Sequence, residues 1–230
     1  MTSFPILLGL DASTGTCSVS LAVGDTVETR LQRQRKGHAA LLLALAEELL
    51  AEAGVARTAV DAIACTRGPG GFTGVRIGVG VAQGLALGLD RPVVPLSTLQ
   101  VLAETAIRQE RRGAGVLALL DARMGEVYGG LFRHQAGVPG TTVPVDLEWL
   151  GPPAPVSLPT GEWFGAGSGF EAYPDLASMV GLHSVGADCI PDMGAGMILA
   201  SRQFAKGGGV PGHRLDPVYL RNRVADPPVS

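Results

Sequence analysis

The stretch Arg67-Gly-Pro-Gly-Gly-Phe-Thr-Gly74 lies between an apolar run, residues 62–65, and a long segment with little charge. A turn so rich in glycine and proline lets the backbone adopt unusual torsion angles and approach another surface closely. Such turns often hold phosphates, but a P-loop needs Lys and then Ser or Thr after the last glycine, where this chain has Val75 and Arg76. We therefore interpret the stretch as a tight connection that positions the next helix, with Thr73 as its N-cap; phosphate binding is the alternative.

The elements on either side of this turn follow a regular order. Short apolar or alternating runs predict strands, and longer periodic runs predict helices. A hairpin signal, Gly24-Asp25, helps to join the first three strands into an antiparallel meander. The first half is thus predicted to be a βββαβαβα module with strands 6–10, 17–23 and 27–32, helix 38–53, strand 62–66, helix 73–89, strand 92–96, and a helix from its N-cap Ser97 to about 110.

The second half restarts this pattern in a degenerate form. We predict strands at 116–120 and 126–132, then a Pro-rich irregular segment at 137–159, and a helix at 195–204. The Leu10-Asp11 and Leu120-Asp121 pairs each end a strand before a turn, which indicates an internal duplication. We expect two domains, residues 1–108 with the partner-packing helices and residues 109–230 with an irregular insertion and a tail.

The composition limits the compartment and the class of ligand. The 230 residues are 46% hydrophobic and 17% charged, which is typical of a globular chain. The net charge of −3 argues against a chain that binds nucleic acid alone, because phosphate neutralisation needs clustered Lys and Arg. The densest basic group, residues 30–36, is interpreted as a solvated strand end, with a shared RNA-facing surface as the alternative. Three distant cysteines and the lack of a basic leader predict a cytoplasmic protein with no signal peptide and no membrane span.

The two long helices of the first half carry more apolar surface than one buried stripe requires. On helix 38–53, Leu43 and Leu50 lie on a different side from the main leucine stripe. On helix 73–89 glycine recurs, and because each mid-helix glycine costs roughly 0.5–1 kcal/mol relative to alanine, the run indicates a close helix–helix approach. We predict that one side of this pair packs on the chain's own sheet and the other on a partner; packing within the subunit alone is the alternative. The predicted interface consists of Leu42, Leu45, Leu49, Ala53, Gly78, Val81 and Leu85.

Three motifs occur in an order that resembles one family. They are Leu8-Gly-Leu-Asp-Ala-Ser-Thr14, Arg67-Gly-Pro-Gly-Gly-Phe-Thr-Gly-Val-Arg-Ile-Gly78 and Asp121-Ala-Arg-Met-Gly-Glu-Val-Tyr128. Together they resemble the bacterial TsaB (YeaZ) family, a non-catalytic subunit of the machinery that makes threonylcarbamoyladenosine in tRNA. The resemblance implies an α/β fold of the actin-like ATPase type (ASKHA, ribonuclease H-like), with two βββαβαβα-type subdomains of which the second is degenerate.

The same resemblance implies the partners. A TsaD-like catalytic paralogue would form a heterodimer with this chain through the first two helices, and a TsaE-like ATPase would join the complex. The tRNA would be reached only through the complex, and the chain alone would be able to self-pair as a homodimer. The function so predicted is a scaffold that supports transfer of threonylcarbamoyl to the adenosine next to the anticodon.

The resemblance also bears on catalysis. In the paralogue a His-x-x-x-His pair binds the metal, and its positions align here with Thr98 and Leu102. Neither residue can replace an imidazole ligand, and the four histidines of the chain form no such pair. We therefore expect a pseudoenzyme with no catalytic residues and no metal. An independent actin-like ATPase or kinase, or a metallopeptidase, is the alternative.

Weak nucleotide binding is the remaining candidate chemistry. Asp11, Ser13 and Thr14 stand where actin-like ATPases place their first phosphate-binding turn, and Asp121 resembles part of a second one. These four residues are the candidates for a residual ATP or ADP site. The alternative is that the hydroxyls satisfy the backbone of their own turn and that Asp121 pairs with Arg123.

Overall fold

The computed structural model describes residues 5–33, 36–110, 115–135 and 141–221 of the chain. Its first sheet holds β1 (Leu7–Asp11), β2 (Thr16–Val23), β3 (Thr26–Arg33), β4 (Ala62–Thr66) and β5 (Val93–Leu96), in the order β3-β2-β1-β4-β5. The first three strands are antiparallel neighbours, and β4 and β5 continue the sheet in parallel with β1. This arrangement confirms the predicted meander followed by crossover strands.

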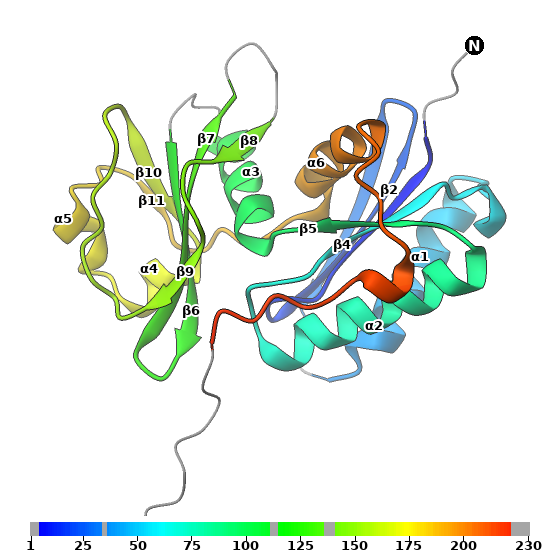
Figure 1. Ribbon diagram of the computed structural model, residues 1–230, viewed down its shortest axis with the longest axis horizontal. Helices are drawn as coiled ribbons and strands as arrows, with labels where there is room; N and C mark the ends of the chain where they lie inside the picture. The colour runs from blue at the N-terminus through cyan, green and yellow to red at the C-terminus, as the bar shows by residue number, and fades with distance from the viewer. Residues whose placement is uncertain (1–4, 34–35, 111–114, 136–140, 222–230) are drawn as a thin grey trace, which may run out of the picture.

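Helices cover both faces of the first sheet (Figure 1). On one face α1 (His38–Glu52) and α2 (Phe72–Leu89) lie against alternate strand residues such as Leu8, Leu10 and Ile63. On the other face α6 (Met193–Ala205) packs against residues of opposite parity, such as Leu7. Because side chains alternate across a strand, one central strand supplies both cores.

The second sheet is shorter and less regular. Its strands β6 (Gly115–Arg123), β7 (Glu126–His134), β8 (Thr142–Pro144), β10 (Trp163–Ala166) and β11 (Val185–Gly186) follow the order β11-β10-β6-β7-β8, and β9 (Trp149–Gly151) also pairs with β7. One face carries α3 (Thr98–Glu110), and the other carries α4 (Ser168–Ala172) and α5 (Leu176–Val180). In the first half, α1 connects the meander to the parallel strand β4. Among the residues that the structure describes, no helix connects the second meander to the parallel strand β10, so this half is degenerate as expected.

The segment predicted to be irregular, residues 137–159, contains two strands. Both β8 and β9 are only three residues long, too short for an alternating pattern to identify them. Residues 137–140 lie outside the described part of the chain. Single-turn helices η1 (Arg57–Ala59) and η2 (Gly212–Arg214) were also not predicted.

Two helices cross the predicted domain boundary. Helix α3 belongs to the first half by sequence but packs on the second sheet, through residues such as Leu99 and Leu102. Helix α6 belongs to the second half but packs on the first sheet, through Met193 and Met197. The division at residues 108 and 109 stays a prediction. It separates the halves by their order in the sequence, whereas α3 and α6 each pack on the sheet of the other half.

The glycine-rich turn that precedes α2 packs directly on the backbone of the β1–β2 turn. The amide of Gly71 donates to the carbonyl of Ser13 over 2.7 Å. A methyl group at Gly70 or at Gly74 would collide with the carbonyl oxygen of Ser13 or of Ala12, respectively. The turn is therefore a tight connection that positions α2, as predicted, and glycine is required there by a backbone contact.

The start of α2 differs from the prediction. The helix begins at Phe72 with Gly71 as its N-cap, so Thr73 lies in the first turn and makes no capping hydrogen bond. The predicted cap of α3 is confirmed, because Ser97 Oγ accepts from the amide of Gln100 over 3.2 Å.

Helix α2 is long and apolar enough to cross a membrane, by length and composition alone. Its inner side, including Val79 and Ala82, packs in the core, as in the core helices of soluble proteins.

The glycines of α2 offer a matched pair of stability tests. Gly74→Ala places a methyl group against the Ala12 carbonyl, so we expect a loss of about 1–3 kcal/mol in the free energy of unfolding, measured by chemical denaturation. Gly80→Ala adds a methyl group in open space on the same helix, and we expect a gain of about 0.5–1 kcal/mol. Equal effects of the two substitutions would contradict the described contact.

Candidate functional site

The candidate site lies where the first sheet faces the second. Asp11 is the last residue of β1, and Thr66 is the last residue of the neighbouring parallel strand β4. The carboxyl ends of parallel strands meet at one edge of a sheet, which is where ligands of open α/β folds bind. Both side chains are buried there.

Asp11 is held by the hydroxyls around it. Its Oδ1 accepts from the hydroxyl of Ser13 over 2.6 Å, from the amide of Ser13 over 3.1 Å, and from the hydroxyl of Thr66. Its Oδ2 is buried and has no hydrogen-bond partner among the residues that the structure describes. Burial raises the pKa of the Asp11 carboxyl, the hydrogen bonds oppose this shift, and the negative charge of Asp192 adds to it.

The hydroxyls of the β1–β2 turn form hydrogen bonds with residues at the ends of the same turn. Ser13 donates to Asp11, and Thr14 Oγ1 accepts from the amide of Thr16 over 3.4 Å. The glycine-rich turn occupies the space beside Ser13. A bound phosphate needs free hydroxyl or amide donors, and Ser13 has none to give, so this arrangement lends the predicted ATP or ADP site no support.

Asp121 lies near the end of β6, where it pairs with Val127 of β7 shortly before the turn between the two strands. It forms an ion pair with Arg123, with 3.0 Å between Oδ2 and the guanidinium, and its Oδ1 accepts from the amide of the same residue over 2.9 Å. The predicted local pair is therefore present. Because the Arg123 side chain is largely exposed, this pair contributes little to stability.

A polar contact between the two halves was not predicted. The hydroxyl of Ser97, at the start of α3, donates to Glu148 of the second half. Burial raises the pKa of the Glu148 carboxyl, and the Ser97 hydrogen bond and the nearby Arg67 guanidinium oppose the shift. No local pattern marks Glu148, because its partner lies 51 residues away in the sequence.

The two positions aligned with the metal-binding histidines of the paralogue lie one helical turn apart at the start of α3. Both Thr98 and Leu102 are fully buried. The Leu102 side chain packs in the core of the second half. Within residues 5–33, 36–110, 115–135 and 141–221, no three His, Cys, Asp or Glu side chains come together as a group that could hold a metal ion.

Only some of the residues predicted to contact a partner are exposed in the structure. Leu42, Leu45 and Leu49 are buried against the chain's own first sheet, because the main leucine stripe of α1 is the stripe that faces the core. These residues therefore form no surface. The same holds for Gly78, which faces Ala12, whereas Ala53 is exposed. The remaining two residues, Val81 and Leu85, are half-buried.

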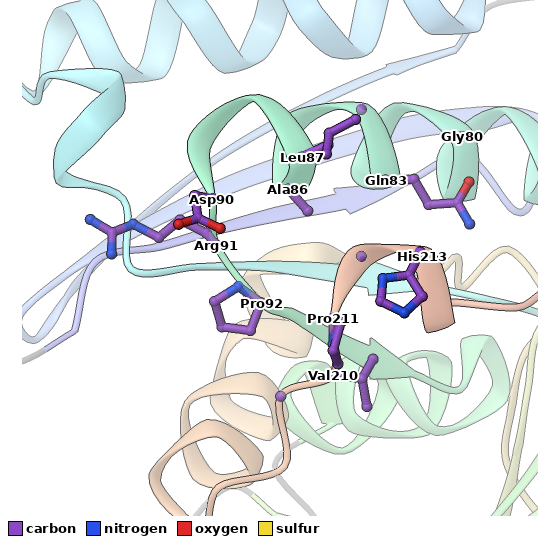
Figure 2. A pocket seen from close by; sticks show the side chains of 13 residues that line it. Gly80, Gln83, Ala86, Leu87, Asp90, Arg91, Pro92, Val210, Pro211 and His213 are labelled. Carbon is purple, nitrogen blue, oxygen red and sulfur yellow. The ribbon is translucent and has the colours of Figure 1, made fainter.

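The exposed side of the helix pair carries other apolar residues. Leu43 on α1 is 41% exposed and Leu87 on α2 is 84% exposed. Gly80 and Gly84 of α2 face open space, where an added methyl group would meet nothing. They line a groove of about 920 Å³ between α2 and the segment 209–213, which Figure 2 shows from close by.

Comparisons with known proteins agree with this architecture. The model of the family described as "TsaD: tRNA N6-adenosine threonylcarbamoyltransferase" matches residues 29–143. The protein of Escherichia coli named "tRNA threonylcarbamoyladenosine biosynthesis protein TsaB" is 36% identical over 233 residues, covering 95% of this chain and 96% of the relative. The protein of the same name from Haemophilus influenzae is 34% identical, covering 95% and 94%. The crystal structure described as YeaZ from Pseudomonas aeruginosa superposes with a TM-score of 0.86 at 40% identity, covering 94% of this chain and all of that one.

The raised pKa of Asp11 predicts a pH-dependent effect of Asp11→Asn. A carboxyl whose pKa is higher in the folded than in the unfolded chain stabilises the fold in acid, and this contribution is lost as the pH rises through the folded-state pKa. We therefore expect the wild-type chain to lose stability relative to the Asp11→Asn variant as the pH rises from about 4. Unfolding free energies of both proteins, measured between acid and neutral pH, check this.

The difference between the two proteins cancels the contribution of Glu148, whose pKa is also raised. A difference that does not change with pH, or that favours the wild type more at neutral pH, would contradict the burial of an unsatisfied carboxyl at Asp11.

Proposed function

Since this chain belongs to the TsaB family, we propose that it serves in the biosynthesis of threonylcarbamoyladenosine in tRNA as a non-catalytic subunit. It pairs with a TsaD-like transferase and supports transfer of threonylcarbamoyl to the adenosine next to the anticodon. The observation that carries this proposal is the similarity over 95% of the chain to relatives that bear the TsaB name. No described feature favours an independent ATPase, kinase or metallopeptidase.

The internal bonding of the candidate site supports a non-catalytic role. Asp11 Oδ1 accepts from the hydroxyl and the amide of Ser13, and both side chains are buried. The position of the first metal ligand of the paralogue holds Thr98, and the second holds a leucine in the core. A fold of this kind keeps its shape while its former reaction centre becomes part of the packing.

The exposed side of α1 and α2 is the proposed surface for the transferase. The TsaD family model matches residues 29–143, a range that includes both helices. Two chains that share a helix pair can bury the same side of it against each other, as four-helix bundles do. The exposed Leu43 and Leu87 supply apolar area, and Gly80 and Gly84 allow a partner helix to approach closely.

The charges on α1 are compatible with burial in such a contact. Glu47 pairs with Arg57 over 2.5 Å, and Glu52 pairs with Arg30 over 2.5 Å. Arg30 also lies 3.7 Å from Glu48, so the positive charge of this arginine, one of the basic group at residues 30–36, is already paired within the chain.

Because this basic group is partly paired, we propose that tRNA is reached only through the complex. A TsaE-like ATPase as a further subunit, a cytoplasmic location, and self-pairing of the isolated chain complete the proposal.

Charge substitutions on this side test the interface. We expect Leu43→Glu together with Leu87→Glu to weaken binding to the cognate TsaD-like protein at least tenfold, about 1.4 kcal/mol, because carboxylates would be buried without partners. Size-exclusion co-elution and calorimetry measure this. The matched control is Leu147→Glu, which places the same charge at a leucine that is 86% exposed in the second half.

Unchanged binding by the double variant would place the interface elsewhere on the chain. Equal weakening by Leu147→Glu would show that the effect comes from added charge and not from the helix pair.

A further inference from the structure

The segment from Leu215 to Arg221, here called the strap, crosses from the first half to the second. In Figure 1 it is the red segment that passes above α2 in this view and ends near the turn between β6 and β7. The halves are also joined by the hydrogen bond of Ser97 with Glu148 and by the covalent connections that lead into α3 and α6, two helices that lie on the opposite side in the same view. The strap is thus a third segment that passes from one half to the other, on the side opposite α3 and α6.

The strap begins at a firm anchor. Leu215 is buried in the core of the first half, and its carbonyl accepts from the side-chain amide of Gln83 over 2.9 Å. From Asp216 to Arg221, by contrast, every residue is half-buried or exposed. This part is therefore held by individual contacts and not by core packing, and such segments open at low free-energy cost.

The middle of the strap lies on the glycine-rich turn and on the start of α2. The amide of Val218 donates to the carbonyl of Arg67 over 2.7 Å. Arg76 Nε donates to the phenolic oxygen of Tyr219 over 2.7 Å, and the same guanidinium lies 3.6 Å above the centre of the Phe72 ring. These contacts join the strap to the turn that packs on Ser13.

The end of the strap binds the second half. Arg221 donates to Glu126 over 2.6 Å and to the carbonyl of Ala122 over 3.0 Å. Its side chain is mostly buried there, at the end of the β6–β7 hairpin where Asp121 also lies. The Arg221 side chain therefore connects the strap, which lies on the glycine-rich turn beside Ser13, to the β6–β7 hairpin that contains Asp121.

We propose that the strap is a latch that holds the two halves closed over the Asp11 turn, and that its release lets them separate. Leu215 keeps the segment attached to the first half when the latch opens, because its burial does not depend on the second half. The contacts that break are those of Arg221 with Glu126 and with the carbonyl of Ala122, because the partners of Val218 and Tyr219 belong to the first half. The chain's own C-terminal segment thus helps to hold the closed arrangement.

Spin-label distances across the two halves test this latch. One label is placed at Ala56 in the first half and one at Glu171 in the second; both positions are exposed. The native cysteines are buried, and burial raises the pKa of the Cys17 thiol to about 11, so they should not compete for the label. Labelled chain is diluted with unlabelled chain so that distances between two copies do not contribute.

The variants isolate the strap. A stop after Asp216 removes the latch contacts but keeps Leu215, and a stop after Arg221 is the matched control that keeps the strap. Arg221→Ala, with Asp216→Asn as its exposed control in the same segment, keeps the test valid if the first truncation fails to fold.

We expect one narrow distance for the wild type and for both controls, and a longer, broader distribution for the latch variants. Hydrogen exchange in residues 121–126 should become roughly ten- to a hundredfold faster in those variants, the ratio that corresponds to about 1.4–2.8 kcal/mol. Unchanged distances and unchanged exchange in folded latch variants would overturn the proposal, and so would equal opening in the chain that stops after Arg221.

Discussion

The contact between the glycine-rich turn and the backbone of Ala12 and Ser13 is the constraint on which the rest of the structure depends. Glycine at positions 70 and 74 lets two backbone segments touch where any side chain would collide. This contact fixes the direction of α2 across the first sheet. It also fills the space beside the Ser13 hydroxyl, so the same packing that orients the helix closes the turn where related folds bind phosphate.

The closed turn and the open helix side are two consequences of that packing. The Ser13 hydroxyl donates to Asp11, and burial raises the pKa of the Asp11 carboxyl. On the outer side of α2, Gly80, Gly84 and the exposed Leu87 line the open groove between this helix and the segment 209–213. These two features are the observations on which the proposed role as a non-catalytic subunit rests.

Local sequence patterns predicted the first half well, because its strands and helices are long and regular. They could not assign the leucines of α1 to the core or to the surface: Leu42, Leu45 and Leu49, which were predicted to face a partner, are buried in the core of the first half. Leu50, which was predicted to lie on a different side with Leu43, is buried in the same core. The short strands β8 and β9 show no period, and Thr73 was displaced as a cap by Gly71. Contacts such as Ser97 with Glu148 and Arg76 with Tyr219 join residues 51 and 143 positions apart, and no local pattern encodes them.

The central claim is that the chain acts through the exposed side of α1 and α2 and not through its former nucleotide turn. The most direct measurement is the rate of tRNA threonylcarbamoylation by the cognate TsaD-like and TsaE-like proteins with Asp11→Asn or with the Leu43→Glu, Leu87→Glu variant in place of the wild-type chain. The account predicts that Asp11→Asn supports the reaction as the wild type does and that the double variant does not. Loss of the reaction with Asp11→Asn, in a complex that still assembles, would contradict it.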